Sequence, residues 1–161
     1  LHPSYGTFQT PELIKNEAER LRAACKMAGT EQKSYGGRMH YLRWEHQTTL
    51  QAWEDAGMHY DTTLSYADRP GFRCGSCFEY PAFNPVTQEL LNIRIRPLIA
   101  MECTIIAERY MNLGYSEAAL SKFIKLKNSC RQVNGCFTLL WHNSHFTNNE
   151  DFEMYEKVIS S

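Results

Sequence analysis

The sequence has no long apolar run and no excess of either charge. No segment reaches the roughly 18 consecutive apolar residues of a transmembrane helix, and no charged stretch followed by an apolar one, as in a signal peptide, is visible after Leu1. The 17 Lys and Arg stand against 18 Asp and Glu, so electrostatics give no reason to expect nucleic acid or an anionic membrane as a partner. What remains is an ordinary globular composition, 43% hydrophobic and 22% charged.

Standard catalytic and nucleotide-binding signatures are missing as well. There is no Walker loop, no G-x-G-x-x-G after a strand, no H-E-x-x-H and no G-x-S-x-G. We see no internal repeat, low-complexity segment or linker. A chain of 161 residues is long enough to bury a sizeable core, and we expect a single domain over residues 1–161.

The six cysteines include only one C-x-x-C pair, Cys74 and Cys77. A zinc site of this type needs a second ligand pair, and the neighbourhood offers none. A thioredoxin-type site needs a strand before the pair and a helix after it. We therefore expect reduced structural thiols, with Cys25, Cys103 and Cys130 as small buried apolar residues. A redox or zinc module built on Cys74 and Cys77 is the alternative.

Four segments carry helical patterns with start and stop residues at their ends. Thr10 and Pro11 suit the first positions of a helix that Gly29 ends. Ser116 suits the N-cap of another helix, and Gly135 its C′ position. The predicted helices cover residues 10–29, 46–57, 116–135 and 148–160. The last of them is expected to bury its apolar side chains Phe152, Tyr155, Val158 and Ile159.

Short apolar strands alternate with these helices. Residues 89–101 are rich in Leu and Ile and partly alternating, which indicates a strand interrupted at Pro97. Residues 136–143, CFTLLWHN, form a continuous apolar run, the pattern of a buried parallel strand. A further short strand is expected within residues 33–44, whereas residues 58–85 form a long stretch rich in turn formers. The alternation predicts an α/β fold with a parallel sheet or barrel.

Polar residues at the carboxyl ends of such strands line the functional sites of α/β folds. His142 directly follows the apolar run FTLLW, where a buried strand ends. Arg38, His40 and Tyr41 are candidates for a second strand end. His145 stands three residues after His142, where a surface role is equally compatible, and the other histidines, His46 and His59, fit helical surface patterns.

The loop ADRPGFRCGSC, residues 67–77, is a candidate binding segment. Asp68, Arg69 and Arg73 bracket a Pro-Gly turn, which is either a turn stabilised by an Asp–Arg pair or a loop that binds an anion or a sugar. Aromatic side chains near the loops can stack on sugar rings, although the place of Trp141 in an apolar strand favours the core. These aromatic residues are Trp44, Tyr66, Phe72, Tyr80 and Trp141.

Four segments, taken in order, carry a family resemblance. They are HPSY at residues 2–5, RMHYLR at 38–43, YDTTLSYADRPGFRCGSC at 60–77 and LLWHNS at 139–144. The chain resembles the polysaccharide deacetylases of the NodB-homology type, in a divergent bacterial branch. This resemblance implies a metal-dependent hydrolase that removes acetyl groups from a bacterial glycan. It also implies a distorted (β/α) barrel, of which this chain is the C-terminal part without the N-terminal strand or strands.

The resemblance assigns roles to matching positions. His2 corresponds to the first histidine of the metal motif, where the family holds a divalent metal, commonly zinc, that lowers the pKa of its bound water. Arg38 corresponds to the arginine that orients the catalytic aspartate, and Tyr41 to the tyrosine whose backbone N–H serves the oxyanion. His142 corresponds to the late histidine that protonates the leaving amine. Asp61 corresponds to a family aspartate that we take to be structural.

The sequence also departs from the family pattern. The second metal histidine is expected at position 6, which is Gly6, and His40 is the alternative ligand. The family's Asp-Asp motif does not appear in residues 1–8, so we expect it before Leu1 and expect the 161-residue chain alone to be inactive. Substrate contacts are expected from Asp68, Arg69, Arg73 and Trp44. The alternative function is a non-catalytic carbohydrate-binding relative with an incomplete metal site.

Overall fold

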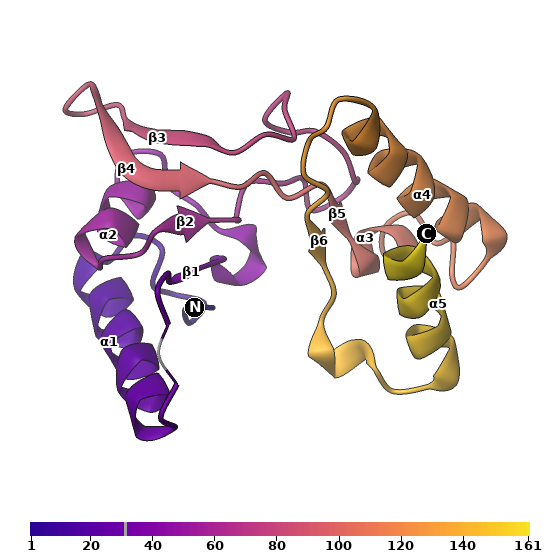
Figure 1. The fold of residues 1–161 in the computed structure, drawn as a ribbon, viewed down its shortest axis with the longest axis horizontal. Coiled ribbons are helices and arrows are strands. Elements are labelled where there is room, and N and C mark those ends of the chain that lie inside the picture. The colour runs from indigo at the N-terminus through magenta and orange to yellow at the C-terminus, as the bar shows by residue number, and fades with distance from the viewer. Residues whose placement is uncertain (31) are drawn as a thin grey trace. The chain divides into compact units, whose positions relative to one another are not determined.

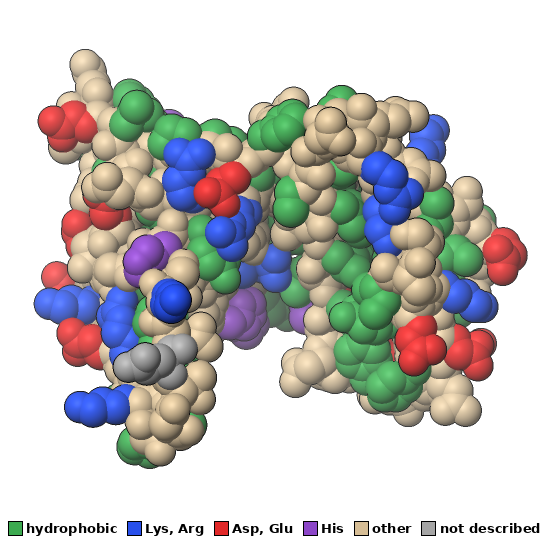
Figure 2. All heavy atoms as spheres, in the orientation of Figure 1, with side chains coloured by type: hydrophobic (Ala, Val, Ile, Leu, Met, Phe, Trp, Pro, Cys, Tyr) green, Lys and Arg blue, Asp and Glu red, His purple; other side chains and the backbone are tan. Residues whose placement is uncertain are grey.

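A computed structural model describes residues 1–30 and 32–161, which divide into two compact units. Unit 1 consists of Leu1–Leu64 and Glu79–Arg96, and unit 2 of Ser65–Phe78 and Pro97–Ser161. Each unit has a hydrophobic core of its own. On the face that Figure 2 shows, acidic and basic side chains are interspersed, as the balanced composition predicts.

Unit 1 combines two helices with a four-stranded mixed sheet (Figure 1). The sheet order is β1-β2-β4-β3; β1, β2 and β4 run parallel, and β3 pairs with β4 as an antiparallel hairpin. Burial alternates along β4, so its inward side chains Leu91, Ile93 and Ile95 join the core. The elements are α1 (Pro11–Met27), β1 (Gly36–Gly37), the 3₁₀ turn η1 (His40–Leu42), α2 (Thr49–Asp55), β2 (Tyr60–Asp61), β3 (Tyr80–Asn84) and β4 (Glu89–Ile95).

The Gly36–Gly37 pair explains how the N-terminal segment joins this sheet. A Cβ at Gly37 would lie 1.8 Å from the carbonyl oxygen of Leu1, and one at Gly36 would lie 2.4 Å from the ring of Tyr60. Because neither glycine has a side chain, the chain near Leu1 runs against β1, and the Arg38 backbone nitrogen donates to the Leu1 carbonyl at 3.0 Å. This contact places His2 beside Arg38.

Unit 2 combines three helices with a two-stranded parallel sheet, β5 with β6. Ser116 caps α4 by accepting a hydrogen bond from the Ala119 backbone nitrogen, as expected from the sequence. The core centres on the fully buried Phe123, against which Trp141 packs. The elements are β5 (Ala100–Met101), α3 (Glu102–Ile106), α4 (Glu117–Gln132), β6 (Leu139–Leu140), the 3₁₀ turn η2 (Asn143–His145) and α5 (Asn149–Ser160).

Several local predictions are wrong. On α5, Phe152 and Ile159 are 51% and 52% exposed, and the helix buries Met154 and Asp151 beside Val158. Asp151 enters the interior because the Tyr115 hydroxyl donates to it. The expected buried strand at residues 136–143 is only Leu139–Leu140 and is half-buried.

Other boundaries and burial patterns also differ from expectation. The left-handed residue after α4 is Asn134, with φ 54°, and not Gly135, which packs on Cys77. Cys25 and Cys103 are half-buried, whereas Cys77 and Cys130 are buried. The stretch 58–85, predicted as one long loop, contains β2 and β3.

The structure is therefore mixed α/β. Its parallel pairs agree with the predicted class, and neither sheet closes into a barrel within the described part of the chain. The partial (β/α) barrel and the single domain over residues 1–161 stay predictions. Among the described residues, every helix is too short or too polar to cross a membrane.

Candidate functional site

The two parallel strands of unit 2 end in functional side chains. Ala100 pairs with Leu139 and Met101 with Leu140, so both strands end at the same edge. Glu102 follows β5 directly and opens α3, and His142 follows β6 after one residue. Parallel strand topology, rather than sequence proximity, therefore brings these two residues together.

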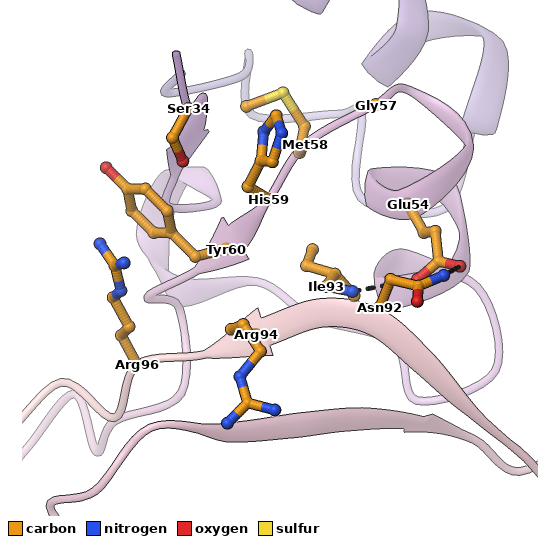
Figure 3. A pocket seen from close by; sticks show the side chains of 10 residues that line it. All are labelled: Ser34, Glu54, Gly57, Met58, His59, Tyr60, Asn92, Ile93, Arg94 and Arg96. Carbon is orange, nitrogen blue, oxygen red and sulfur yellow. Dashed lines mark hydrogen bonds between the residues drawn. The ribbon is translucent and has the colours of Figure 1, made fainter.

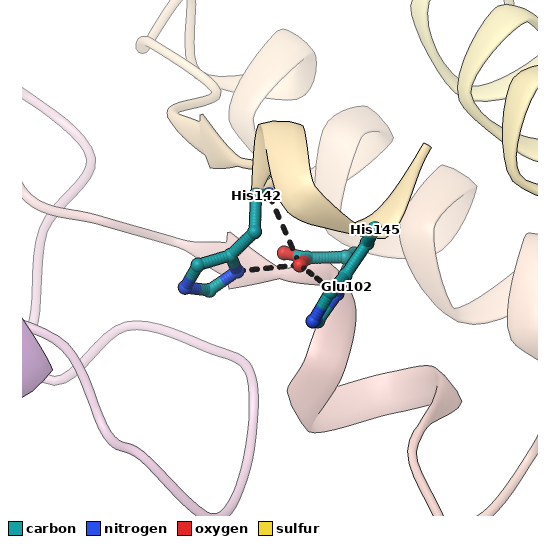
Figure 4. Close-up of side chains that lie close together, drawn as sticks. All are labelled: Glu102, His142 and His145. Carbon is teal, nitrogen blue, oxygen red and sulfur yellow. Dashed lines mark hydrogen bonds and ion pairs between the residues drawn. The ribbon is translucent and has the colours of Figure 1, made fainter. Parts of the chain in front are cut away.

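One oxygen of Glu102 binds both histidines of this edge (Figure 4). Glu102 Oε1 lies 2.5 Å from His142 Nδ1 and 2.7 Å from His145 Nδ1, and it also accepts from the His142 backbone nitrogen at 3.0 Å. An ionised carboxylate only accepts hydrogen bonds, so His142 Nδ1 is the donor in its bond to Oε1, while His145 Nδ1 lies in contact with the same oxygen. This arrangement fixes the tautomer and the orientation of His142, because both its ring and its backbone bind the same oxygen.

Glu102 is buried, while the two imidazoles reach the surface. The Glu102 side chain is 2% exposed, whereas those of His142 and His145 are 38% and 45% exposed. Its second oxygen, Oε2, is buried without a hydrogen-bond partner among the described residues. A buried carboxylate is costly unless it is paired, so the two histidines are part of what stabilises it here.

A pocket of about 260 Å³ opens beside this cluster, lined by Glu102 and His145 together with Cys103, Tyr115 and Asp151. Burial favours the neutral form of Asp151, but hydrogen bonds from Tyr115 and the Thr147 backbone, with the nearby His145, outweigh it and lower the pKa of Asp151. For Cys103, burial and the Glu102 charge raise the thiol pKa to about 11. The pocket thus has two buried carboxylates on its wall.

In unit 1, the residues predicted to hold the metal lie together. The rings of His2 and His40 stack with centroids 4.8 Å apart, and Tyr41 stacks on His40 at 5.1 Å. His2 Nδ1 is 2.8 Å from the Arg38 carbonyl oxygen. Tyr41 is 73% exposed and has a left-handed φ of 59°, a conformation that costs a non-glycine residue energy.

Arg38 lies at the carboxyl edge of the parallel strands, as predicted. Its Nε donates to the Thr62 carbonyl at 3.0 Å. Burial raises the pKa of Asp61 to about 6, while hydrogen bonds from Thr63 and the charge of Arg38 act in the opposite direction. Asp61 is fully buried, and both of its carboxylate oxygens accept hydrogen bonds from Thr63.

A metal at His2 and His40 needs further ligands. A catalytic zinc ion usually has three protein ligands, and this pair supplies two imidazoles. In the described chain, the one group of three or more His, Cys, Asp or Glu donors within reach of one another is Glu102, His142 and His145. The unit 1 pair therefore does not complete the zinc site that the resemblance implies.

The predicted substrate-binding residues are divided between the two units. In unit 2, Asp68 and Arg69 pair at 3.5 Å as exposed neighbours, while Arg73 Nη1 donates to the Ser65 carbonyl at 2.6 Å. Both arginines approach the Tyr66 ring, at 5.0 and 5.9 Å. Trp44 belongs to unit 1, where it is half-buried against the core. The Asp–Arg turn is present, and sugar binding by this loop stays a prediction.

Unit 1 also has a pocket of about 480 Å³ that the sequence did not indicate (Figure 3). Arg94 and Arg96 on its wall both pair with Glu79, and the Arg96 guanidinium lies 3.8 Å from the centre of the Tyr60 ring. The hydrogen bond from Arg96 lowers the pKa of Glu79. These arginines are therefore partly neutralised by a carboxylate.

Comparison with protein-family models, curated proteins and solved structures finds no match to this chain. The candidate site is therefore identified from the geometry of its residues. That geometry joins His142 to His145 and to Glu102, and separately joins His2, Arg38, His40 and Tyr41 within unit 1. Sequence reasoning missed Glu102, although it follows the apolar run PLIAM as His142 follows FTLLW, and the same strand-end rule applied to both would have found it.

Proposed function

We propose that this chain provides the proton-transfer histidine of a hydrolase that removes acetyl groups from a bacterial glycan, as polysaccharide N-deacetylases do. The observation that carries the proposal is the 2.5 Å contact between Glu102 Oε1 and His142 Nδ1 at paired strand ends. A histidine held at Nδ1 by a buried carboxylate is a standard acid–base arrangement. The family resemblance independently assigns His142 this role.

The proposed reaction is hydrolysis of an acetamide. Water adds to the carbonyl carbon, the C–N bond breaks, and acetate and a free amine leave. Because Nδ1 of His142 is engaged by Glu102, the proton passes from Nε2 to the departing nitrogen, and the Glu102 charge stabilises the imidazolium before transfer. The family resemblance assigns two further roles: Arg38 positions the carboxylate base, and the Tyr41 backbone N–H stabilises the oxyanion.

The divalent metal implied by the resemblance is part of the proposal. His2 and His40 are its candidate nitrogen ligands, with stacked rings 4.8 Å apart. A metal bound there would lower the pKa of its water and polarise the carbonyl. Since the pair lacks a third donor among the described residues, no reaction step is assigned to the metal here.

The experiment is acetate release from N-acetylglucosamine oligomers by the purified protein in the presence of zinc. His142→Ala is expected to lower kcat by about 10²- to 10⁴-fold, the usual contribution of an acid–base residue. The matched control is His46→Ala, because His46 is an exposed histidine of unit 1. Wild-type kcat in His142→Ala, or no acetate release by the wild-type protein, would refute the proposal.

A carbohydrate-binding protein without catalysis is the second candidate. Tyr5 and Tyr41 favour it, since their rings contact each other at 5.5 Å and remain 55% and 73% exposed. Exposed aromatic rings are suitable surfaces for sugar stacking. Glycan binding that is lost in Tyr41→Ala, with no acetate release by the wild type, would support this second function instead.

A further inference from the structure

We propose that Glu102, His142 and His145 form a binding site for a divalent transition-metal cation of the zinc type, with ligands other than His2 and His40. Nothing in the sequence pattern or the family resemblance assigns a metal to this place. The site lies entirely within unit 2. Its donor atoms, the burial of Glu102 and the charge of the adjoining pocket all favour a bound cation.

The donor set suits zinc. One carboxylate and two imidazoles offer ligand atoms that all lie within 4.8 Å of one another. Two nitrogens and one oxygen match the three-ligand sites in which zinc keeps a fourth position for water. Calcium and magnesium prefer oxygen ligands and are expected to bind poorly.

The buried oxygen of Glu102 points to a missing partner. Oε1 accepts two hydrogen bonds from His142 and contacts His145 Nδ1, whereas Oε2 is buried and accepts none from the described residues. A buried carboxylate oxygen without a partner costs free energy. A cation bound at Oε2 supplies that partner and leaves the bond from the His142 backbone to Oε1 in place.

The adjoining pocket favours a cation. Glu102 and Asp151 are both buried, at 1% and 2% exposure. The residues that line the pocket include these two carboxylates and His145 but neither Lys nor Arg. An acidic concavity whose lining contains no Lys or Arg attracts cations by its field.

Metal binding requires a small movement of the histidines. Ligand bonds of 2.0–2.1 Å in a tetrahedron separate neighbouring donor atoms by about 3.3 Å, whereas Oε1 lies 2.5 and 2.7 Å from the two Nδ1 atoms. Both contacts are therefore shorter than the spacing of two ligands on one metal, so the imidazoles move away from Oε1 when the cation binds. His145, at 45% exposure and on the short turn η2, has room to make this shift.

The site has a functional consequence that depends on the proposed function. A cation that binds His142 ties up the imidazole needed for proton transfer. Zinc beyond the amount needed for activity is therefore expected to inhibit, in competition with protons at this cluster. The binding itself does not depend on that function and is tested without a turnover assay.

The test is titration of the full chain with zinc by calorimetry, repeated with cobalt(II), whose visible absorption reports four-coordinate binding. His145→Ala is expected to weaken this site by about tenfold or more, through loss of one of three ligands. Glu102→Gln is expected to do the same. His46→Ala, and a variant with both His2→Ala and His40→Ala, are expected to retain it.

His145 is half-exposed, so His145→Ala is expected to fold, and its far-ultraviolet circular dichroism verifies this. Equal zinc affinity in wild type and His145→Ala would overturn the inference. So would a wild type that binds no zinc, or binding that disappears only when His2 and His40 are replaced. Acetate release that depends on His142, together with no zinc binding at His145, would leave the proposed function standing and reject the metal site alone.

Discussion

Both carboxylate oxygens of Asp61 are bonded to Thr63, Oδ1 by the backbone nitrogen at 2.9 Å and Oδ2 by the hydroxyl at 2.6 Å. Thr63 Oγ1 in turn accepts from the Met39 backbone nitrogen, so this pair joins the segment after β2 to the segment after β1. Despite these hydrogen bonds, the burial of the Asp61 carboxyl group raises its pKa from 3.8 to about 6.

Asp61 therefore makes the folded chain less stable as pH rises. Between its unfolded pKa of 3.8 and its folded pKa of about 6, the folded state holds the proton more tightly, so this group's contribution to the free energy of unfolding falls with pH. The total is on the order of 3 kcal/mol for a shift of about two units. The difference in the free energy of unfolding between Asp61→Asn and wild type is therefore expected to shift by that amount in favour of the variant as pH rises from 4 to 7.

Urea unfolding of both proteins at several pH values measures the difference. Subtracting the wild-type values cancels the contributions of other carboxyl groups to the free energy of unfolding. One of these is Glu79, whose pKa is lowered chiefly by the hydrogen bond from Arg96 and whose contribution therefore changes with pH in the opposite direction. A difference between Asp61→Asn and wild type that does not vary with pH would contradict the account.

Tyr41 is expected to carry backbone strain. With φ 59°, and with Leu42 next to it at 53°, it occupies a region that favours glycine. Tyr41→Gly and Tyr41→Ala both remove the ring, but only glycine relieves the strain. Tyr41→Gly is expected to be more stable than Tyr41→Ala by about 1 kcal/mol in thermal or urea unfolding. Equal stability, or a more stable alanine variant, would show that the turn is unstrained.

The thiols are expected to differ in reactivity. Burial, with the neighbouring Cys77, raises the pKa of Cys130 to about 12, whereas Cys136 is exposed. An aromatic disulfide reagent at pH 8 should modify Cys136 first and Cys130 only after unfolding. Cys136→Ala should remove the fastest phase. A chelator that speeds modification of Cys74 or Cys77 would revive the zinc alternative for that pair.

Glu102 is expected to act by positioning His142. Glu102→Gln removes the charge beside the imidazole while keeping nearly the same shape. On the proposed function it lowers kcat for acetate release and leaves KM near its wild-type value, because Glu102 acts there through His142 and not by binding the substrate. Equal losses in kcat and 1/KM, or loss of the folded state, would instead indicate a structural role.

The local patterns of the sequence predicted much of this structure. Thr10, Pro11 and Gly29 bounded α1 because caps and stops act within a few residues. The inward face of α5 was not predictable from hydrophobicity, since Asp151 is buried through a hydroxyl from Tyr115, 36 residues away. The two-residue strands were hard to predict because tertiary pairing, not a long pattern, defines them.

The site was predictable in part. The strand-end rule found His142 and Arg38, both of which lie where parallel strands end. It also applies to Glu102, which directly follows the predicted strand 89–101, but a carboxylate at that position carries no pattern that singles it out in the sequence. His145 was undecided, since only the fold shows that the carboxylate accepting from His142 also lies 2.7 Å from the Nδ1 atom of His145.

The most direct test of the account is the protonation state of the His142 ring. Proton–nitrogen correlation spectra of the imidazoles, with His142→Ala for assignment, report which ring nitrogen carries the proton. We predict that Nδ1 of His142 carries a proton, in a downfield signal that Glu102→Gln abolishes. A neutral His142 with its proton on Nε2, unchanged by Glu102→Gln, would show that the carboxylate does not hold the imidazole.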